Sequence, residues 1–210
     1  MLDTVKRESI YQPLQPGLKF PEKPVFATHA EERRHRQQRL VAACRAFAVH
    51  GLDYGFAGHL TIRDPEHPEL YWTNPMAAHF AQVRLGNLIL ADHKGRVGQG
   101  SHAINRAGFV LHAAVHEAHP DILAMCHAHT VYGVAYAALG RPLPPVTQDA
   151  CAFFEDHVVI SDEGGKVAVE EQAGHNFAAA FKGVKAAIHQ NHGLITASRH
   201  SIEAAAFWFI

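Results

Sequence analysis

The chain has 210 residues, which is enough for one domain with a substantial core and short for two. Hydrophobic residues make up 48% of it and charged residues 19%, and the formal net charge is −1, as in ordinary globular proteins. The 19 Lys and Arg residues are interspersed among 20 Asp and Glu residues, so we expect no nucleic-acid partner. We also expect no membrane association, because no apolar run approaches the ~18 residues of a membrane span.

Two further features predict a cytoplasmic location. The N-terminal sequence MLDTVKRESIYQP lacks the apolar segment of a signal peptide. The three cysteines, Cys44, Cys126 and Cys151, are odd in number and show no CxxC spacing. A reducing compartment is therefore favoured over a secreted disulfide framework.

The N-terminal part of the sequence predicts an arm followed by a helix. Residues 1–27 are rich in proline and charge, so we expect an extended arm, either disordered or laid over a neighbouring subunit, ahead of one domain at 28–210. Thr28 and Glu31 have the spacing of a capping box, and the helix that starts there is expected to end at Gly51. Its charge-dense stretch 31–39 is predicted to be a solvated face.

The rest of the chain alternates between short apolar runs and helical periodicity. The glycines of 95–100 have neither P-loop nor dinucleotide-binding spacing and predict a hairpin turn. Helices before, within and after short strands predict an α/β or α+β sandwich. The apolar ending 207–210 favours a last helix whose remainder is missing over a buried one. Strands are expected at 60–62, 70–73, 88–92, 122–130 and 157–161 and on both sides of a turn within 185–197, and helices at 107–118, 130–140, 170–181 and 201–210, the last capped by Ser201.

Histidine is unusually frequent, with 18 residues, and CHAHT is the motif of most interest. In a strand, His127 and His129 point to the same face. They lie in an otherwise apolar run, where two buried imidazoles without partners would be costly. A third imidazole is available in QNHGLIT, where Gly193 gives the backbone freedom to aim His192. From the residues alone, a three-histidine metal site and a set of core histidines both remain open.

Other histidines lie where they could face such a site. His112 and His116 are four residues apart in a predicted helix and share a face, which suits pocket lining, packing or, less well, metal ligation. In GHLTIR, Gly58 allows close backbone approach and His59 could reach a substrate carboxylate or phosphate. Arg63 has a structural alternative, a pair with Asp64 or another acid.

The order of these motifs resembles the class II aldolase/adducin family. The resemblance runs from about residue 30 to the end, through GHLTIRDP, TNP, LILAD, HKGRV, AGFVLHAAVH, HPDILAMCHAHT and NHGLIT. It implies an αβα sandwich with a central, mainly antiparallel sheet. It also implies one divalent metal ion held by His127, His129 and His192, with zinc expected first and manganese, iron or cobalt as alternatives. Homotetramers with active sites between subunits are implied as well.

The sequence departs from the sugar-phosphate aldolases of that family. They have an acid/base Glu where this chain has Gly108, a GN turn where it has Gly58-His59, and paired serines where it has Arg106-Ala107. A phosphorylated substrate is therefore not expected, and the pattern is closer to the adducin-like branch that includes decarboxylases. The expected catalytic residues are His59, His112 and His116. The expected substrate-binding residues are Gly58, Asn74, Asn105 and Arg106. Asp149, Glu155 and Asp156 are further candidates for an acid near the site, with a solvated loop as the alternative.

The leading hypothesis is a metal-dependent lyase, an aldolase or decarboxylase. It would act on a small, non-phosphorylated keto or hydroxy acid through an enolate stabilised by the metal. Two alternatives are a non-haem iron oxygenase on the same fold and a non-catalytic, adducin-like oligomerisation module.

Overall fold

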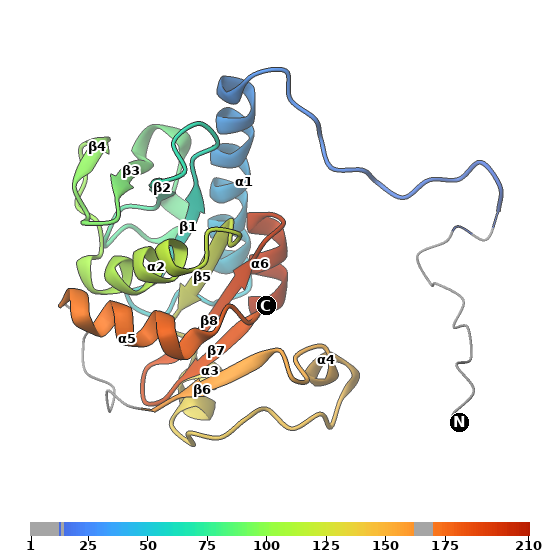
Figure 1. Ribbon diagram of the computed structural model, residues 1–210, viewed down its shortest axis with the longest axis vertical. Helices are drawn as coiled ribbons and strands as arrows, with labels where there is room; N and C mark the ends of the chain where they lie inside the picture. The colour runs from blue at the N-terminus through green and yellow to red at the C-terminus, as the bar shows by residue number, and fades with distance from the viewer. Residues whose placement is uncertain (1–12, 14, 162–169) are drawn as a thin grey trace.

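The computed structural model describes residue 13, residues 15–161 and residues 170–210 (Figure 1). The α-helices are α1 His29–Val49, α2 Arg106–Ala118, α3 Val131–Ala137, α4 Gln148–Cys151, α5 Glu171–Phe181 and α6 Ile202–Phe209, with 3-10 turns η1 Phe80–Gln82 and η2 Leu85–Asn87. The strands are β1 His59–Arg63, β2 Leu70–Thr73, β3 Ile89–Asp92, β4 Val97–Gln99, β5 Ala124–Ala128, β6 His157–Ile160, β7 Ala186–His189 and β8 Gly193–Ser198.

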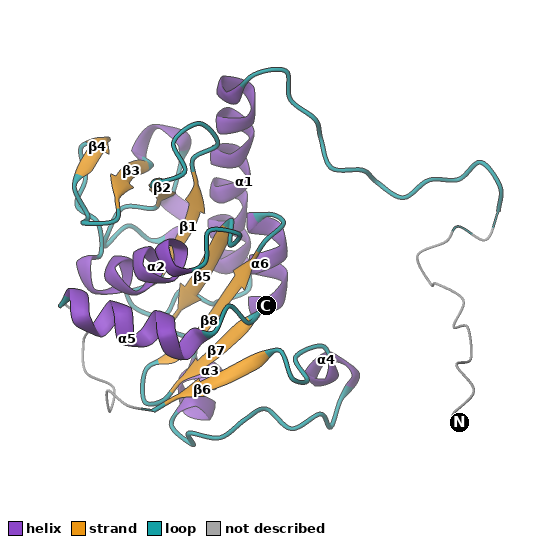
Figure 2. Cartoon of the chain, in the orientation of Figure 1, coloured by secondary structure: helices purple, strands orange, loops and turns teal. Residues whose placement is uncertain are grey.

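The strands form one sheet in the order β4-β3-β2-β1-β5-β8-β7-β6 (Figure 2). Neighbouring strands are antiparallel, apart from the parallel pair β6 and β7. The expectation of a mainly antiparallel sheet is therefore confirmed. β3 and β4 form a hairpin whose turn, at 93–96, includes Gly95 at φ 74°. The turn predicted at 95–100 is thus placed too late, because residues 97–99 are strand β4.

Helices cover both faces of the sheet, as expected for an αβα sandwich. The alternation of side chains along β1 assigns the faces, because Leu60 and Ile62 lie in the core that contains α1 and α6. Thr61 projects to the opposite face, where α2 lies. On that second face, Met125 and Ile195 pack with residues of α2 and α5. The candidate site lies on this face.

Both predicted N-caps are confirmed. The Thr28 hydroxyl accepts from the backbone of Glu31, whose carboxylate accepts in return, and the Ser201 hydroxyl caps α6. Residues 15–27 precede α1 without helix or strand and are mostly exposed (Figure 1). The expected arm at 1–12 lies outside the described residues.

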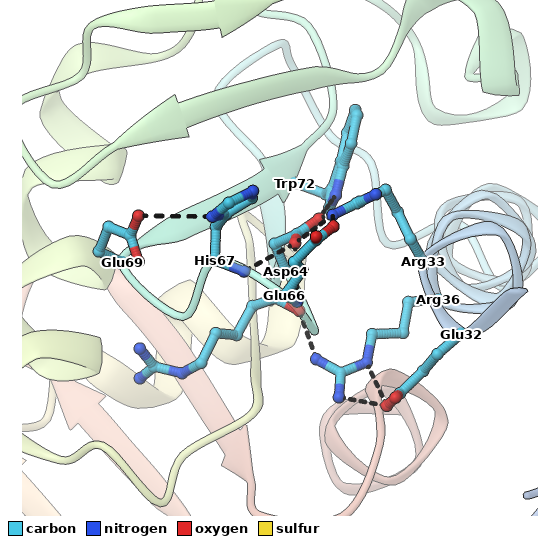
Figure 3. Close-up of polar contacts among 9 residues, drawn as sticks. Glu32, Arg33, Arg36, Asp64, Glu66, His67, Glu69 and Trp72 are labelled. Carbon is cyan, nitrogen blue, oxygen red and sulfur yellow. Dashed lines mark hydrogen bonds and ion pairs between the residues drawn. The ribbon is translucent and has the colours of Figure 1, made fainter. Parts of the chain in front are cut away.

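Residues 31–39 are exposed or partly exposed, as predicted for a solvated face, but the pair of Arg63 with Asp64, one alternative for Arg63, is not observed. Asp64 pairs with Arg33 of α1, at 2.6 Å between Arg33 Nε and Asp64 Oδ2 (Figure 3). Arg63 instead donates to backbone carbonyls that include that of His116, at 2.7 Å. Within the stretch 31–39, Arg33 turns towards a buried carboxylate. Trp72 also donates to Asp64, at 2.8 Å. A buried carboxylate needs such partners because isolated charge is costly to bury.

Candidate metal centre

The candidate site lies at one end of the central strands. His59 at the start of β1 is directly opposite His127 near the end of β5. The neighbouring strand β8 begins at Gly193, which is opposite His189 across the turn from β7. Three separate segments therefore place histidines at the same end of the sheet.

His127, His129 and His192 come together as expected. Their ring centroids are 5.0 Å apart for His127–His129, 4.9 Å for His127–His192 and 5.1 Å for His129–His192. One nitrogen from each ring lies within 4.8 Å of the others, so the three can hold one metal ion. His129 lies just beyond the last residue of β5, but its ring still faces the same way as that of His127. His192 is presented by a turn in which Asn191 has φ 61°, a left-handed conformation that asparagine tolerates.

The chemistry of these rings fits a metal. The Nδ1 of His127 lies 2.8 Å from the carbonyl oxygen of Leu194, so it is the donor nitrogen and Nε2 keeps its lone pair. The Nε2 atoms of His127 and His129 are buried and have no hydrogen-bond partner among the described residues. Burial lowers the pKa of all three rings, to about 4 for His192. Neutral imidazoles with bare nitrogens are the form that binds a metal.

His59 and Gly108 occupy one space between β1 and α2. The His59 ring lies 5.0 Å from that of His127, and a Cβ added at Gly108 would stand 1.9 Å from its Cε1. Gly108 is thus the residue that lets the His59 ring fit. The two departures from the sugar-phosphate aldolases, at 59 and at 108, are one structural feature. Burial lowers the pKa of His59 to about 4, and its Nδ1 lies 3.1 Å from the carbonyl of Ala57.

His112 and His116 lie on the buried face of α2, both fully enclosed. His112 is next to His59, with 4.2 Å between ring centroids, whereas His116 stacks on Tyr71 at 4.6 Å. Thr61 lies between the two histidines and contacts a nitrogen of each. Sequence reasoning missed Thr61, although its position two residues after His59 in a strand puts it on the same face.

The side chains of the predicted substrate-binding asparagines bond to the backbone. Asn74 accepts from the Leu60 amide at 2.9 Å and donates to Gly58, and Asn105 donates to the Ala57 carbonyl at 2.8 Å while capping α2. Both therefore hold the loop before His59. Gly58 lines a shallow hollow together with His129, which places it beside the triad.

Arg106 and the three candidate acids do not join the triad. Arg106 lines a different pocket, of ≈ 180 Å³, on the other side of α2 with Lys94 and Glu117. Asp156 bonds to the Lys185 amide at 2.9 Å, at the end of β6 and β7 opposite the one that leads to His189. Asp149 and Glu155 are exposed, in α4 and in the turn that follows it. These two acids therefore match the alternative expectation of a solvated loop rather than an acid near the site.

Comparison with known proteins identifies the family. Residues 38–210 match the model of the Class II Aldolase and Adducin N-terminal domain. The chain belongs to this family. It is 44% identical over 192 residues to "Decarboxylase NovR" of Streptomyces niveus, covering 90% of this chain and 70% of that protein. It is equally identical to "4-hydroxy-3-prenylphenylpyruvate oxygenase/4-hydroxy-3-prenylbenzoate synthase" of Streptomyces roseochromogenus subsp. oscitans, covering 90% of this chain and 69% of that protein.

A solved structure confirms the class II aldolase fold. "L-fuculose 1-phosphate aldolase from Glaciozyma antarctica PI12" superposes with a TM-score of 0.82 at 41% identity, covering 90% of this chain and 73% of that one. The chain is therefore a class II aldolase-like enzyme, and one of its relatives is named a decarboxylase. None of the helices in the described ranges is long and apolar enough to cross a membrane.

Proposed function

We propose that this protein is a metal-dependent carbon–carbon lyase, with decarboxylation as its reaction, acting on a small, non-phosphorylated keto or hydroxy acid. The observation that supports it most is the set of three neutral imidazoles, one buried and two partly buried, each with one nitrogen within 4.8 Å of the others. The relative named a decarboxylase, at 44% identity, supports the choice of reaction.

In this proposal His127, His129 and His192 hold one divalent ion. Such an ion, when bound, would act as a Lewis acid and stabilise the negative charge that develops on a substrate oxygen when carbon dioxide leaves. Three neutral ligands leave the ion its full charge. Zinc, manganese, iron and cobalt are all compatible with three imidazoles, so the ligand set does not select one of them.

His59 is the group we propose for proton transfer beside the metal. Its Nε2 is buried and has no hydrogen-bond partner among the residues described, and its ring adjoins both His112 and His127. It fills the space next to Gly108, where the sugar-phosphate aldolases carry their acid/base Glu. A neutral imidazole there can take up a proton from the substrate through Nε2 and then return that proton to a carbanion.

The proposal of a non-phosphorylated substrate depends on the residues around the loop that precedes His59. The Asn74 and Asn105 side chains are engaged with backbone groups, and Arg106 lies in a pocket on the other side of α2. The chain also lacks the GN turn and the paired serines expected of a phosphate pocket. Because the similar solved structure is named an L-fuculose 1-phosphate aldolase, L-fuculose 1-phosphate is the phosphorylated substrate against which this proposal is tested.

The experiment is metal analysis combined with a substrate screen. Purified protein is stripped and reloaded with zinc, manganese, cobalt or ferrous iron. It is then assayed for carbon dioxide release from aliphatic and aromatic 3-keto acids, with and without a 2-hydroxyl group, and for aldol cleavage of L-fuculose 1-phosphate. We expect one metal ion per chain and turnover of an acid. His127→Ala should lose both, whereas the exposed His200→Ala should keep both. Full activity of His127→Ala without metal would refute the proposal.

A second candidate is a non-haem iron oxygenase on the same site. The relative named as an oxygenase/synthase, equal in identity to the decarboxylase, favours it. The same screen separates the two, because an oxygenase needs ferrous iron and consumes dioxygen, and a lyase turns over anaerobically.

We also propose a homotetramer with active sites between subunits, as the family resemblance implies. Light scattering of the purified chain tests this assembly. A metal-free tetramer that persists unchanged in His127→Ala and has no activity would instead support an adducin-like oligomerisation module.

A further inference from the structure

Thr61 of β1 connects two buried histidines of α2. Its hydroxyl oxygen lies 2.9 Å from Nδ1 of His112 and 3.0 Å from Nε2 of His116. Nδ1 of His116 in turn lies 3.2 Å from the backbone carbonyl of Ile122. The four groups form a chain of three hydrogen bonds between the sheet and the helix.

The carbonyl group of Ile122, at one end of this series of hydrogen bonds, fixes the donor and the acceptor of each bond. A carbonyl oxygen only accepts, so Nδ1 of His116 must carry a proton and donate it to Ile122. Burial lowers the pKa of His116 to about 3, so the ring is neutral and its Nε2 is an acceptor. The single hydroxyl proton of Thr61 is then donated to His116. Thr61 has only lone pairs left for His112, which must donate through Nδ1.

The consequence falls on the other nitrogen of His112. Burial also lowers the pKa of this ring, so with Nδ1 protonated, Nε2 keeps a bare lone pair. This atom is buried and has no hydrogen-bond partner among the described residues. Buried acceptors in native proteins are nearly always satisfied, so a donor that the chain does not provide is expected. The His112 ring lies beside His59, which adjoins His127, so that donor would lie next to the candidate metal centre.

We propose that Thr61, oriented by His116, is a positioning residue that holds His112 in its Nδ1–H tautomer, so that Nε2 accepts a hydrogen bond from the hydroxyl group of a hydroxy acid at the metal centre. The second half of this inference rests on the proposed function. His116 thereby acts through Thr61 rather than on the substrate, since both of its nitrogens are engaged within the chain.

The tautomer is measured directly by nitrogen-15 NMR of histidine-labelled, metal-free protein at neutral pH. In the wild type we expect His112 and His116 to be neutral and protonated at Nδ1. Thr61→Val keeps the shape but removes the acceptor of the His112 proton, so His112 should shift to the Nε2–H form or to a mixture. Thr61→Ser retains the hydroxyl and should preserve the wild-type signals.

The ligand half is tested with zinc-loaded protein and two small chelating acids. Glycolate offers a carboxylate and a hydroxyl donor, whereas oxalate has no hydroxyl. We expect Thr61→Val to weaken glycolate binding by about tenfold, the effect of one lost neutral hydrogen bond, and oxalate binding by less than about twofold. Thr61→Ser should bind both as the wild type does.

Each outcome decides a separate point. An Nε2–H tautomer of His112 in the wild type, or an unchanged Nδ1–H tautomer in Thr61→Val, overturns the inference. Equal losses for glycolate and oxalate overturn its ligand half, because Thr61 would then act only on the general structure. The tautomer measurement needs neither metal nor turnover, so it stands even if the proposed function fails. If Thr61→Val does not fold, the wild type and Thr61→Ser still provide the tautomer.

Discussion

At the scale of single residues, the contact between His59 and Gly108 couples two positions at which this sequence departs from the sugar-phosphate aldolases. An imidazole at 59 needs the space that any side chain at 108 would take. The carboxylate of the aldolases and the histidine of this chain are therefore mutually exclusive solutions at the same position. Replacing Gly108 by Glu alone should not restore aldolase chemistry.

This exclusion predicts that Gly108→Ala destabilises the wild type but stabilises the His59→Ala variant, which a double-mutant cycle can measure. Gly108→Ala in the wild type forces the His59 ring to move, and overpacking of this kind costs about 1–3 kcal/mol. In a His59→Ala background the space is free, and the same substitution in the interior of α2 should stabilise by about 0.5–1 kcal/mol, since alanine favours helix over glycine. Urea unfolding of the four proteins measures the cycle. The same cost in both backgrounds would mean that the two residues do not compete.

The metal ligands are the part of the site that the sequence predicts best. The spacing of His127 and His129 fixes their common direction, because strand geometry is local. His192 could be named only through its turn composition and the family resemblance. The partnership of His59 with Gly108, and that of Thr61 with two histidines, depend on how α2 lies against β1. Such contacts between distant segments are not encoded in any local spacing.

At the scale of elements, Asp64 joins α1 to the β1–β2 hairpin. It accepts from Arg33 and from Trp72, and also from the backbone amides of Glu66 and His67 (Figure 3). These donors hold its pKa well below the ordinary value, against the opposing effect of burial. The carboxylate therefore has a structural role that is independent of the metal centre.

We predict that Asp64→Asn destabilises the protein by about 1–3 kcal/mol, because an amide accepts fewer hydrogen bonds than the carboxylate and leaves a buried donor such as Trp72 Nε1 without its acceptor. Glu66→Gln is the matched control, since it removes the other carboxylate that pairs with Arg33 from a side chain that is 47% exposed. It should cost at most about 1 kcal/mol. Urea unfolding compares the two, and equal losses would contradict the assigned role of Asp64.

The boundaries of the elements show where sequence patterns lose precision. The strand predicted at 122–130 is observed as Ala124–Ala128, and the helix predicted at 130–140 as Val131–Ala137. Hydrophobic periodicity marks the buried middle of an element, whereas its ends depend on which neighbouring strand continues the hydrogen bonding. The pairing of Arg33 with Asp64 was missed for a related reason, because these two residues are 31 positions apart in the sequence and meet only when α1 packs against the sheet.

At the scale of the whole molecule, a cluster of neutral buried histidines makes stability depend on pH. Burial lowers the pKa of His59 and His192 to about 4 and that of His116 to about 3, whereas unfolded histidines titrate near 6.5. As the pH falls below about 6.5, the unfolded chain takes up protons that the native chain does not. Stability is thus fully present above that pH and is lost as the pH falls towards 4.

We therefore expect the unfolding free energy of the metal-free protein to fall between pH 6.5 and 4, by up to about 1.4 kcal/mol per pH unit for each such histidine. Urea titrations at half-unit steps measure the slope. The exposed His200→Ala should leave it unchanged. A flat profile in this window would show that the buried rings are protonated in the native protein or titrate normally.

Metal binding should oppose this loss, because an ion bound by the native site alone stabilises the folded state by mass action. At free zinc about 100 times the dissociation constant, the gain is about 2.7 kcal/mol at constant pH. His192→Ala removes one of three ligands and should abolish most of the gain, while His200→Ala should retain it. The measurement is the urea midpoint with and without zinc at pH 7. An equal shift in wild type and His192→Ala would mean that zinc binds elsewhere, and the three-histidine centre would then have to be abandoned as the metal site.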